Sequence, residues 1–335
     1  MATATATKSN GPPPTSFDNL QRTKILLLGQ RGSGKTSIQQ VLFNDVPPKQ
    51  TFYLEPTSRA VKHRYDTVIP LEIWDCPGNT SPDTLGASLA DFSSIIFVID
   101  IQDSYQQPVA RMLDFFAAAY QENPGATLEV FVHKAESLAE DYKIENFRHI
   151  QQRVIDELFD ASPEYEQMPV NFHLTSVYDH SIREAFSRVL HKLIDSLPYL
   201  EDLLNVFCSN SQASKAFLFD VKSRLYVATD ESPVDTGMHN LCCDYVRTLS
   251  AFGPLYMSAS VNADSRSFYP SAAVSLAQGT TLTYHLITPQ LALLAMLHPG
   301  VFEERRGLLE YNVVFFREGV QEIALVERDA RSGNL

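Results

Sequence analysis

The sequence predicts a mixed α/β protein in which a mostly parallel sheet interleaved with helices is followed by a smaller α+β unit. Short apolar runs recur between residues 24 and 176, as expected of strands buried on both faces. Helix-like stretches separate the later runs, which favours parallel pairing. After about residue 198 the rhythm changes to two strands, one helix, three strands and a last helix, which predicts a second unit.

The elements of the first unit follow in order. The run "KILLLG" (24–29) predicts a buried strand, and a helix is expected directly after it over 35–45. "SRAVKHRYD" (58–66) alternates as an exposed strand does. The remaining expected strands are "PLEIWD" (70–75), "SIIFVID" (94–100), "LEVFVHK" (128–134) and "VNFHLTS" (170–176), and the remaining helices are expected at 105–122, 144–159 and 181–197.

The second unit is expected to be an α+β domain of β-β-α-β-β-β-α order. "KAFLFDVKSRLYVATDE" (215–231) predicts two strands joined by a turn. A helix over 236–250, a strand in "TTLTYHLIT" (280–288) and a final helix over 308–328 are also expected, and the polar insert 258–280 is expected to be a long loop. The predicted organisation is a disordered tail at 1–20, a first domain at 21–197 and a second domain at 198–330.

Composition and charge limit the class of protein. The chain has 335 residues, 44% of them hydrophobic, and a net charge of −13. An acidic chain is a poor partner for nucleic-acid phosphates or for an anionic membrane surface. The run "LALLAML" is too short to cross a bilayer, so no direct membrane insertion is expected. The opening residues lack the apolar core of a signal peptide, and the four cysteines are expected to be free thiols, so a cytoplasmic location is expected.

A phosphate-binding loop is the strongest motif. "GQRGSGKTS" (29–37) has the spacing G-x-x-x-x-G-K-T and stands between an expected strand and an expected helix. Backbone N–H groups of such a loop converge on phosphate oxygens, and the helix N-terminus adds a partial positive charge. Lys35 is expected to reach the β- and γ-phosphates and Thr36 to bind Mg²⁺. The expected nucleotide-binding residues of the loop are Gln30, Arg31, Gly32, Ser33, Gly34, Lys35, Thr36 and Ser37.

Further motifs stand where a GTPase has them. "WDCPGN" (74–79) carries D-x-x-G after a strand, so Asp75 is expected to hold Mg²⁺ through water and the Gly78 amide to meet the γ-phosphate. Thr57 lies in the segment expected to close over the metal. "FVHKAE" (131–136) and "LTSVYD" (174–179) occupy the places of the N-K-x-D and S-A-K motifs, and their expected base-site residues are His133, Lys134, Glu136, Ser176 and Val177. The expected catalytic positions are Lys35, Gly78 and Asn79.

These motifs, together with three long stretches, resemble the Rag family of small GTPases, and specifically its C/D type, which includes the fungal Gtr subunits. The stretches are "LTSVYDHSIREAFSRV", "LLNVFCSNSQASKAFLFDVKSRLYVATDESPVD" and "LLEYNVVFFREGV", and the similarity runs over residues 24–326. The resemblance implies a Ras-like G domain that binds GTP or GDP with Mg²⁺, followed by a roadblock-like (longin-type) domain.

The resemblance also implies partners. A C/D-type subunit pairs with an A/B-type Rag subunit through the second domains. A membrane-anchored scaffold complex recruits such pairs to the vacuolar or lysosomal surface, where they report amino-acid sufficiency to the TOR kinase complex. A GTPase-activating protein is expected to assist slow intrinsic hydrolysis.

Two positions depart from the usual pattern. Glu136 stands where guanine recognition normally uses Asp, and its extra methylene is expected to weaken or alter selectivity unless the strand end shifts. Asn79 stands where Gln usually orients the attacking water, and its side chain is one methylene shorter. Both departures leave open a second interpretation, a scaffold subunit that holds nucleotide and barely hydrolyses it. A small-molecule kinase is the third alternative, although the stretch after Gly78 has no arginine before Arg111.

Overall fold

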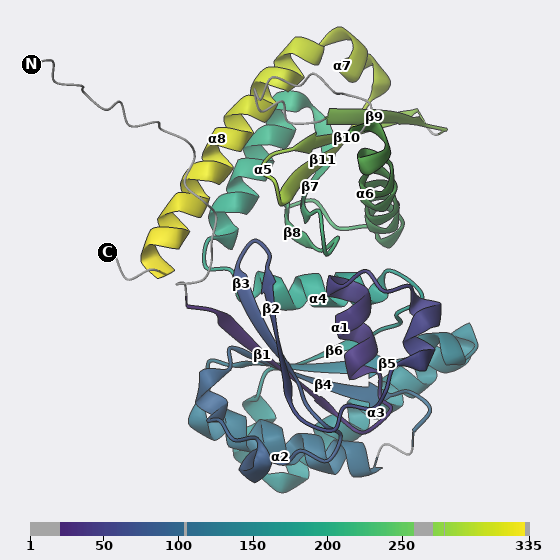
Figure 1. The fold of residues 1–335 in the computed structure, drawn as a ribbon, viewed down its shortest axis with the longest axis vertical. Helices are drawn as coiled ribbons and strands as arrows, with labels where there is room; N and C mark the ends of the chain where they lie inside the picture. Colours follow the sequence, from purple (N-terminus) through teal and green to yellow (C-terminus); the bar gives the residue numbers. More distant parts are fainter. Residues whose placement is uncertain (1–20, 104–105, 258–270, 278, 332–335) are drawn as a thin grey trace, which may run out of the picture.

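The computed structural model describes residues 21–103, 106–257, 271–277 and 279–331 (Figure 1). The expected tail at 1–20 lies outside these ranges, as do residues 258–270 of the insert that was expected to be a loop.

The first sheet is six-stranded, in the order β2-β3-β1-β4-β5-β6, and is parallel except for the antiparallel β2–β3 pair. Its strands are β1 (Thr23–Gly29), β2 (Val61–Asp66), β3 (Pro70–Asp75), β4 (Ser94–Asp100), β5 (Thr127–His133) and β6 (Val170–Leu174). This arrangement confirms the predicted parallel α/β unit. In such a sheet the carboxyl ends of the parallel strands meet at one edge, where ligand-binding loops collect.

Helices cover both faces of this sheet (Figure 1). The helices α1 (Lys35–Phe43) and α4 (Ser181–His191) pack on one face, and α2 (Gln106–Glu122) and α3 (Glu140–Ala161) pack on the other. Side chains alternate along each strand, so Ile25 and Leu27 of β1 join the first core while Leu26 and Leu28 join the second. Burial on both faces explains why these strands appear in the sequence as continuous apolar runs.

The second sheet is five-stranded and antiparallel, in the order β8-β7-β11-β10-β9. Its strands are β7 (Ala213–Asp220), β8 (Tyr226–Thr229), β9 (Ser271–Leu276), β10 (Thr280–Leu286) and β11 (Leu291–Leu297). One face packs against α6 (Thr236–Met257), and the other against α5 (Leu197–Ser211) and α8 (Arg306–Arg331), which lie side by side in Figure 1. The predicted α+β, roadblock-like second part is therefore confirmed.

The remaining helices are short. They are α7 (Pro299–Glu304) and the 3-10 turns η1 (Pro48–Tyr53), η2 (Pro82–Thr84), η3 (Leu89–Asp91), η4 (Ala135–Ser137) and η5 (Pro163–Gln167).

The expected helix over 181–197 is wrong in its last third. The helix α4 ends at His191, and the separate helix α5 begins at Leu197, with Pro198 in its first turn. Proline is tolerated in the first turn of a helix but would break a helix that continued through it. The second part therefore begins with a helix that the predicted β-β-α-β-β-β-α order did not include.

The expected long loop over 258–280 is also wrong in part, because its last third forms β9. This strand pairs with β10 over the register Ser271↔His285 to Leu276↔Thr280. Its residues alternate between exposed and half-buried positions, as in an edge strand with one open face.

The two parts of the chain share one apolar core. A single cluster of buried side chains runs from Ile25 and Phe186 in the first part to Leu204 and Leu218 in the second. Polar contacts cross the same boundary: the Tyr226 amide donates to Ser187 Oγ at 3.0 Å, and Arg224 pairs with Asp45 at 2.6 Å. The helix α4 lies between the two sheets in Figure 1, so the sheets do not pack directly on one another.

Candidate functional site

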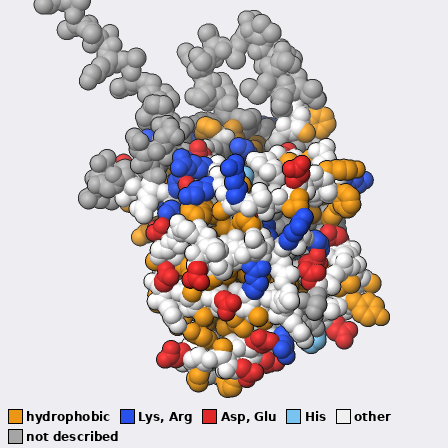
Figure 2. Space-filling model, turned by 60° about the horizontal axis from the view of Figure 1, so that its bottom comes forward, with side chains coloured by type: hydrophobic (Ala, Val, Ile, Leu, Met, Phe, Trp, Pro, Cys, Tyr) orange, Lys and Arg blue, Asp and Glu red, His pale blue; other side chains and the backbone are white. Residues whose placement is uncertain are grey.

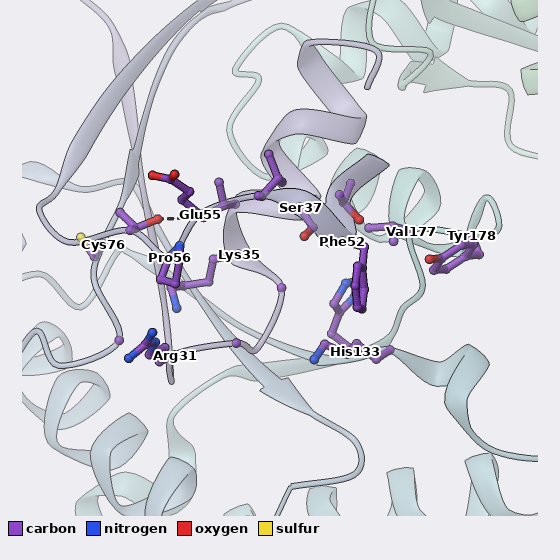
Figure 3. Close-up of a pocket in the computed structure, with 18 of the residues that line it drawn as sticks. Arg31, Lys35, Ser37, Phe52, Glu55, Pro56, Cys76, His133, Val177 and Tyr178 are labelled. Atoms are coloured by element: carbon purple, nitrogen blue, oxygen red, sulfur yellow. Dashed lines mark hydrogen bonds between the residues drawn. The ribbon is translucent and has the colours of Figure 1, made fainter. Parts of the chain in front are cut away.

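A pocket of about 450 Å³ lies at the carboxyl-end edge of the first sheet (Figure 3). Of the predicted site residues, it is lined by Arg31, Gly32, Gly34, Lys35, Thr36, Ser37, Thr57, Gly78, His133, Lys134, Glu136 and Val177. The predicted residues that do not line it are Gln30, Ser33, Asp75, Asn79 and Ser176. Figure 3 shows Arg31, Lys35 and Cys76 toward one end and His133, Val177 and Tyr178 toward the other.

The loop after β1 forms the first of these ends. Lys35 begins α1, and its buried ammonium group donates to the backbone carbonyls of Gly29 (2.8 Å) and Gln30 (2.7 Å). Burial lowers the pKa of Lys35 to about 8, although the charge of Asp75 acts in the opposite direction. Ser33 is buried beside it, and its Oγ has no hydrogen-bond partner within the described ranges. A ligand with several anionic oxygens would satisfy both groups.

Gly34 is required by the closeness of His133. Its φ is +104°, and a Cβ at this position would lie 2.5 Å from His133 Cδ2. The imidazole of His133 contacts Thr175 Oγ1 through Nδ1 at 2.9 Å and is itself buried. Burial, helped by the charge of Lys134, lowers the pKa of His133 to about 4, so the ring is neutral at pH 7. His133 therefore packs against the phosphate-binding loop as an uncharged ring.

Oxygen ligands converge beside Lys35. Thr36 Oγ1 donates to Asp75 Oδ2 at 2.7 Å, Thr57 Oγ1 approaches the same oxygen at 3.2 Å, and the two hydroxyls are 2.9 Å apart. The other carboxylate oxygen, Asp75 Oδ1, is buried without a hydrogen-bond partner in the part of the chain that is described. Hard oxygen donors and an unsatisfied carboxylate fit Mg²⁺, which prefers this ligand chemistry. The predicted metal set Thr36, Thr57 and Asp75 is thus brought together.

Gly78 presses against the phosphate-binding loop. A Cβ on Gly78 would lie 2.7 Å from Arg31 Cα and 2.8 Å from the carbonyl carbon of Gln30, so only glycine fits. Asn79, the next residue, is exposed and does not line the pocket. Asn79 therefore stands outside the pocket lining, and its role in positioning water stays a prediction.

The opposite end of the pocket combines two loops. Lys134, in the left-handed region with φ 62°, lines the pocket while its ammonium group pairs with Asp100 at 2.5 Å. Glu136 is exposed at the mouth. Ser176 does not line the pocket, because its Oγ accepts from the Tyr178 amide at 3.0 Å, which shapes the turn that presents Val177 and Tyr178.

Sequence reasoning missed several residues of this site. The pocket is also lined by Thr51, Phe52, Leu54, Glu55, Pro56, Cys76 and Tyr178. Phe52 is 85% exposed, so its ring does not pack in the core and is open to a ligand or a partner at the pocket. Residues 51–56 could have been predicted to line the pocket, because they directly precede Thr57 in the sequence. Arg111, which contacts the 78–80 segment from α2, carried no local motif.

The fold and this pocket define a P-loop nucleotide-binding protein of the G-protein class. Residues 24–246 match the family model described as "Gtr1/RagA G protein conserved region", so the chain belongs to the Gtr/Rag family of G proteins. The relatives place it with the C/D type. It is 42% identical to GTP-binding protein gtr2 of Schizosaccharomyces pombe, over 90% of this chain and 97% of that protein.

The identities to two further relatives support this assignment to the C/D type. The chain is 41% identical to Ras-related GTP-binding protein C of Homo sapiens, over 90% of this chain and 76% of that protein. It is only 25% identical to GTP-binding protein gtr1 of Schizosaccharomyces pombe, over 63% of this chain and 69% of that protein. Among solved structures, Myxococcus xanthus MglB aligns with 37% of this chain and 93% of its own, with a TM-score of 0.30 and 13% identity.

Proposed function

We propose that this chain is the guanine-nucleotide-dependent switch subunit of a heterodimeric Rag GTPase. The observation that carries the proposal is the convergence of Thr36, Thr57 and Asp75 beside the Lys35 ammonium group. These residues come from three separate segments, and a bound nucleotide with its metal ion is the ligand that needs all of them at once. Family membership supports GTP hydrolysis as the reaction.

The proposed roles follow from this arrangement. Lys35 exchanges its loop contacts for β- and γ-phosphate oxygens, and Ser33 and the loop amides hold the remaining oxygens. Thr36, Thr57 and, through water, Asp75 would hold Mg²⁺, which would supply neutralisation of the phosphate charge. Gly78 presents its backbone at the terminal phosphate. His133, Lys134, Glu136 and Val177 form the base end.

Thr57 supports the switching part of the proposal. Its hydroxyl contacts Thr36 and Asp75, whereas the residues before it, Phe52 and Tyr53, are strongly exposed. A segment held at its end through metal ligands is released when the terminal phosphate is lost. The output is then a change in the affinity for partners.

The partner surface is proposed to include α8 and α5. Tyr311, Val314 and Phe315 of α8 are exposed, while Val313 and Phe316 on its other side are buried. Tyr199 and Val206 are exposed on the neighbouring α5. Apolar surface of this kind favours a protein partner. An A/B-type Rag subunit is the proposed partner, with 21–197 working as the G domain and 198–330 as the dimerisation domain.

The cellular setting is proposed from family membership. The heterodimer would be recruited by a membrane-anchored scaffold complex to the vacuolar or lysosomal surface and would relay amino-acid sufficiency to the TOR kinase complex. Recruitment through partners is proposed from family membership. No helix in the described ranges has the length and apolarity to cross a bilayer. The face shown in Figure 2 carries both basic side chains, several of them in its upper part, and acidic side chains, most of them lower down.

A second candidate function is a scaffold subunit that holds nucleotide and barely hydrolyses it. The exposed Asn79, which does not line the pocket, is the observation that favours it. An activating protein would then have to complete the site, or hydrolysis would play no part in the output.

The test is competitive nucleotide binding by the purified heterodimer. GTP, GDP, ATP and XTP are compared in Mg²⁺ for the wild type and for Glu136→Asp, and hydrolysis is followed over many turnovers with and without an activating protein. We expect guanine nucleotides to bind at least about a hundredfold more tightly than ATP, equivalent to about 2.7 kcal/mol.

The alternatives give different results. Guanine preference with activator-dependent turnover supports the switch, and guanine binding without turnover supports the scaffold. If the wild type discriminates poorly between guanine nucleotides and ATP, and Glu136→Asp restores this discrimination, the base site has lost selectivity for guanine. Failure to bind any nucleoside triphosphate would reject both functions.

A further inference from the structure

Arg111 lies behind the pocket, on the helix α2. Its Nη1 donates to the carbonyl of Gly78, and its Nη2 donates to the carbonyl of Thr80 at 2.7 Å. These two carbonyls stand immediately before and after Asn79. One planar guanidinium therefore fixes the backbone on both sides of this residue, which a flexible ammonium group could not do.

The segment that Arg111 holds is confined from the other side as well. Gly78 lies against Arg31 Cα so closely that no side chain fits between them. The Thr80 amide and hydroxyl both donate to the Pro77 carbonyl, at 3.2 Å and 2.9 Å, which closes the 77–80 turn. The turn is thus pinned between α2 and the phosphate-binding loop.

No carboxylate in the described ranges forms an ion pair with Arg111. Within the described ranges its contacts are the two neutral carbonyls, and its side chain is partly buried. The charge is felt at the pocket, because Arg111 is among the groups that lower the pKa of Lys35, after burial as the main cause. A cation in a partly desolvated place attracts anionic groups over several ångströms.

We propose that Arg111 is a positioning residue for the terminal phosphate: it holds the backbone around Asn79 and adds a positive charge at that end of the pocket. This inference rests on the proposed function of the same site. GTP carries one more phosphate group than GDP at that end, so Arg111 favours the triphosphate and the hydrolysis-ready turn together. The ordering of 77–80 then depends less on nucleotide than the ordering of the segment around Thr57.

Three variants separate the two roles in the purified heterodimer. Arg111→Ala removes both the pair of planar N–H donors and the charge. Arg111→Lys keeps the charge without the planar pair of donors, and Arg111→Gln keeps one donor nitrogen without the charge. The measurements are the ratio of GTP to GDP affinity, hydrogen exchange of the amides at 78–81, and the single-turnover rate of GTP hydrolysis. Arg153→Ala is the matched control, because Arg153 pairs with Glu157 within α3, away from the pocket.

We expect Arg111→Ala to lower the GTP-to-GDP affinity ratio about tenfold, equivalent to about 1.4 kcal/mol, with GDP affinity nearly unchanged. Amide exchange at 78–81 should rise and single-turnover hydrolysis should fall, each by about tenfold. Arg111→Lys should restore the affinity ratio but not the exchange protection, and Arg111→Gln, which lacks the charge and has one donor nitrogen, should restore neither in full. Arg153→Ala should match the wild type.

The proposal is overturned if Arg111→Ala leaves both the affinity ratio and the exchange within twofold of the wild type. If Arg111→Ala does not fold, the Lys and Gln variants decide the question: we expect a higher GTP-to-GDP affinity ratio for Arg111→Lys than for Arg111→Gln, with exchange raised in both, and equal ratios together with wild-type exchange would overturn the proposal. Failure of the wild type to bind guanine nucleotides would instead reject the proposed function. Amide exchange in the nucleotide-free protein would still test whether Arg111 orders the 77–80 turn.

Discussion

At the scale of single residues, Lys35 is held between two backbone carbonyls in a buried place. Its lowered pKa, about 8, means that a modest rise in pH removes the charge on which phosphate binding depends. A bound phosphate stabilises the ammonium form and raises its pKa, so the complex retains a proton that the free protein loses. Binding is therefore strongest below about pH 8 and weakens above it.

We predict that GDP affinity falls by about tenfold per pH unit above about pH 8, where one proton is taken up on binding. Binding constants measured between pH 7 and pH 9 test this. Lys35→Arg is the matched variant, because arginine stays charged over this range, and its profile should be flat. A wild-type profile as flat as that of the variant would show that Lys35 is not the titrating group.

Motifs with fixed local spacing could be predicted at this scale, and residues recruited through tertiary packing could not. The loop at 29–37 and the D-x-x-G segment indicated Lys35, Thr36 and Asp75 because their chemistry requires those types in that order. Arg111 lies 33 residues from Gly78 along the chain, and its contact depends on how α2 packs. Asn79 occupies the position where Gln usually orients the attacking water, and its shorter side chain is exposed, so its role stays a prediction.

At the scale of elements, the end of α1 is tied to the turn between β7 and β8. Arg224 is buried in this turn and pairs with Asp45, whose side chain is mostly exposed. A second buried arginine, Arg183, lies near both. Burial first, and the charge of Arg224 second, lower its pKa to about 10. Asp45 is therefore the carboxylate that compensates two neighbouring cations.

We predict an asymmetry between the two partners of this ion pair. Asp45→Asn leaves buried cations uncompensated and should lower the unfolding free energy by about 2 kcal/mol. Arg224→Met leaves only an exposed carboxylate and should cost less. Denaturant unfolding of the heterodimer measures both, with Asp91→Asn as a control that removes a surface pair with Lys24. Equal losses for Asp45→Asn and Arg224→Met would contradict the argument.

Elements with strong apolar character were predicted well, and those formed by context were not. The runs that became β1, β4 and β5 are buried on both faces, so their sequence alone indicates strands. The strand β9 is built of Ser, Ala, Val and Leu, with little strand propensity beyond one valine. It forms because β10 offers an edge for pairing.

At the scale of the whole molecule, several buried or half-buried histidines are held in the uncharged form. Burial is the main cause that lowers the pKa of His133, His191, His239 and His285 to about 4 each. In the unfolded chain these groups take up protons near pH 6.5. Between about pH 6.5 and pH 4 the unfolded state therefore binds more protons than the folded state, and stability falls as pH falls.

We predict a loss of up to about 1.4 kcal/mol per pH unit for each of these histidines below about pH 6. Unfolding free energies measured at pH 7.5, 6.5, 5.5 and 5.0 test this. His239 is fully buried, and its ring lies beside Phe219 and Tyr226, so His239→Phe removes one titrating group. The acid slope of this variant should be shallower whatever its absolute stability. An unchanged slope would exclude His239 as a contributor.

The apolar cluster that joins the two parts of the chain also bears on how long the protein survives in the cell. Because Ile25 and Phe186 share a core with Leu204 and Leu218, neither part can open without exposing the other. A ligand present at about a thousand times its dissociation constant adds about 4 kcal/mol to the folded state. That free energy then protects the distant second part from proteases as well. The abundance of this subunit is accordingly tied to the occupancy of its nucleotide pocket.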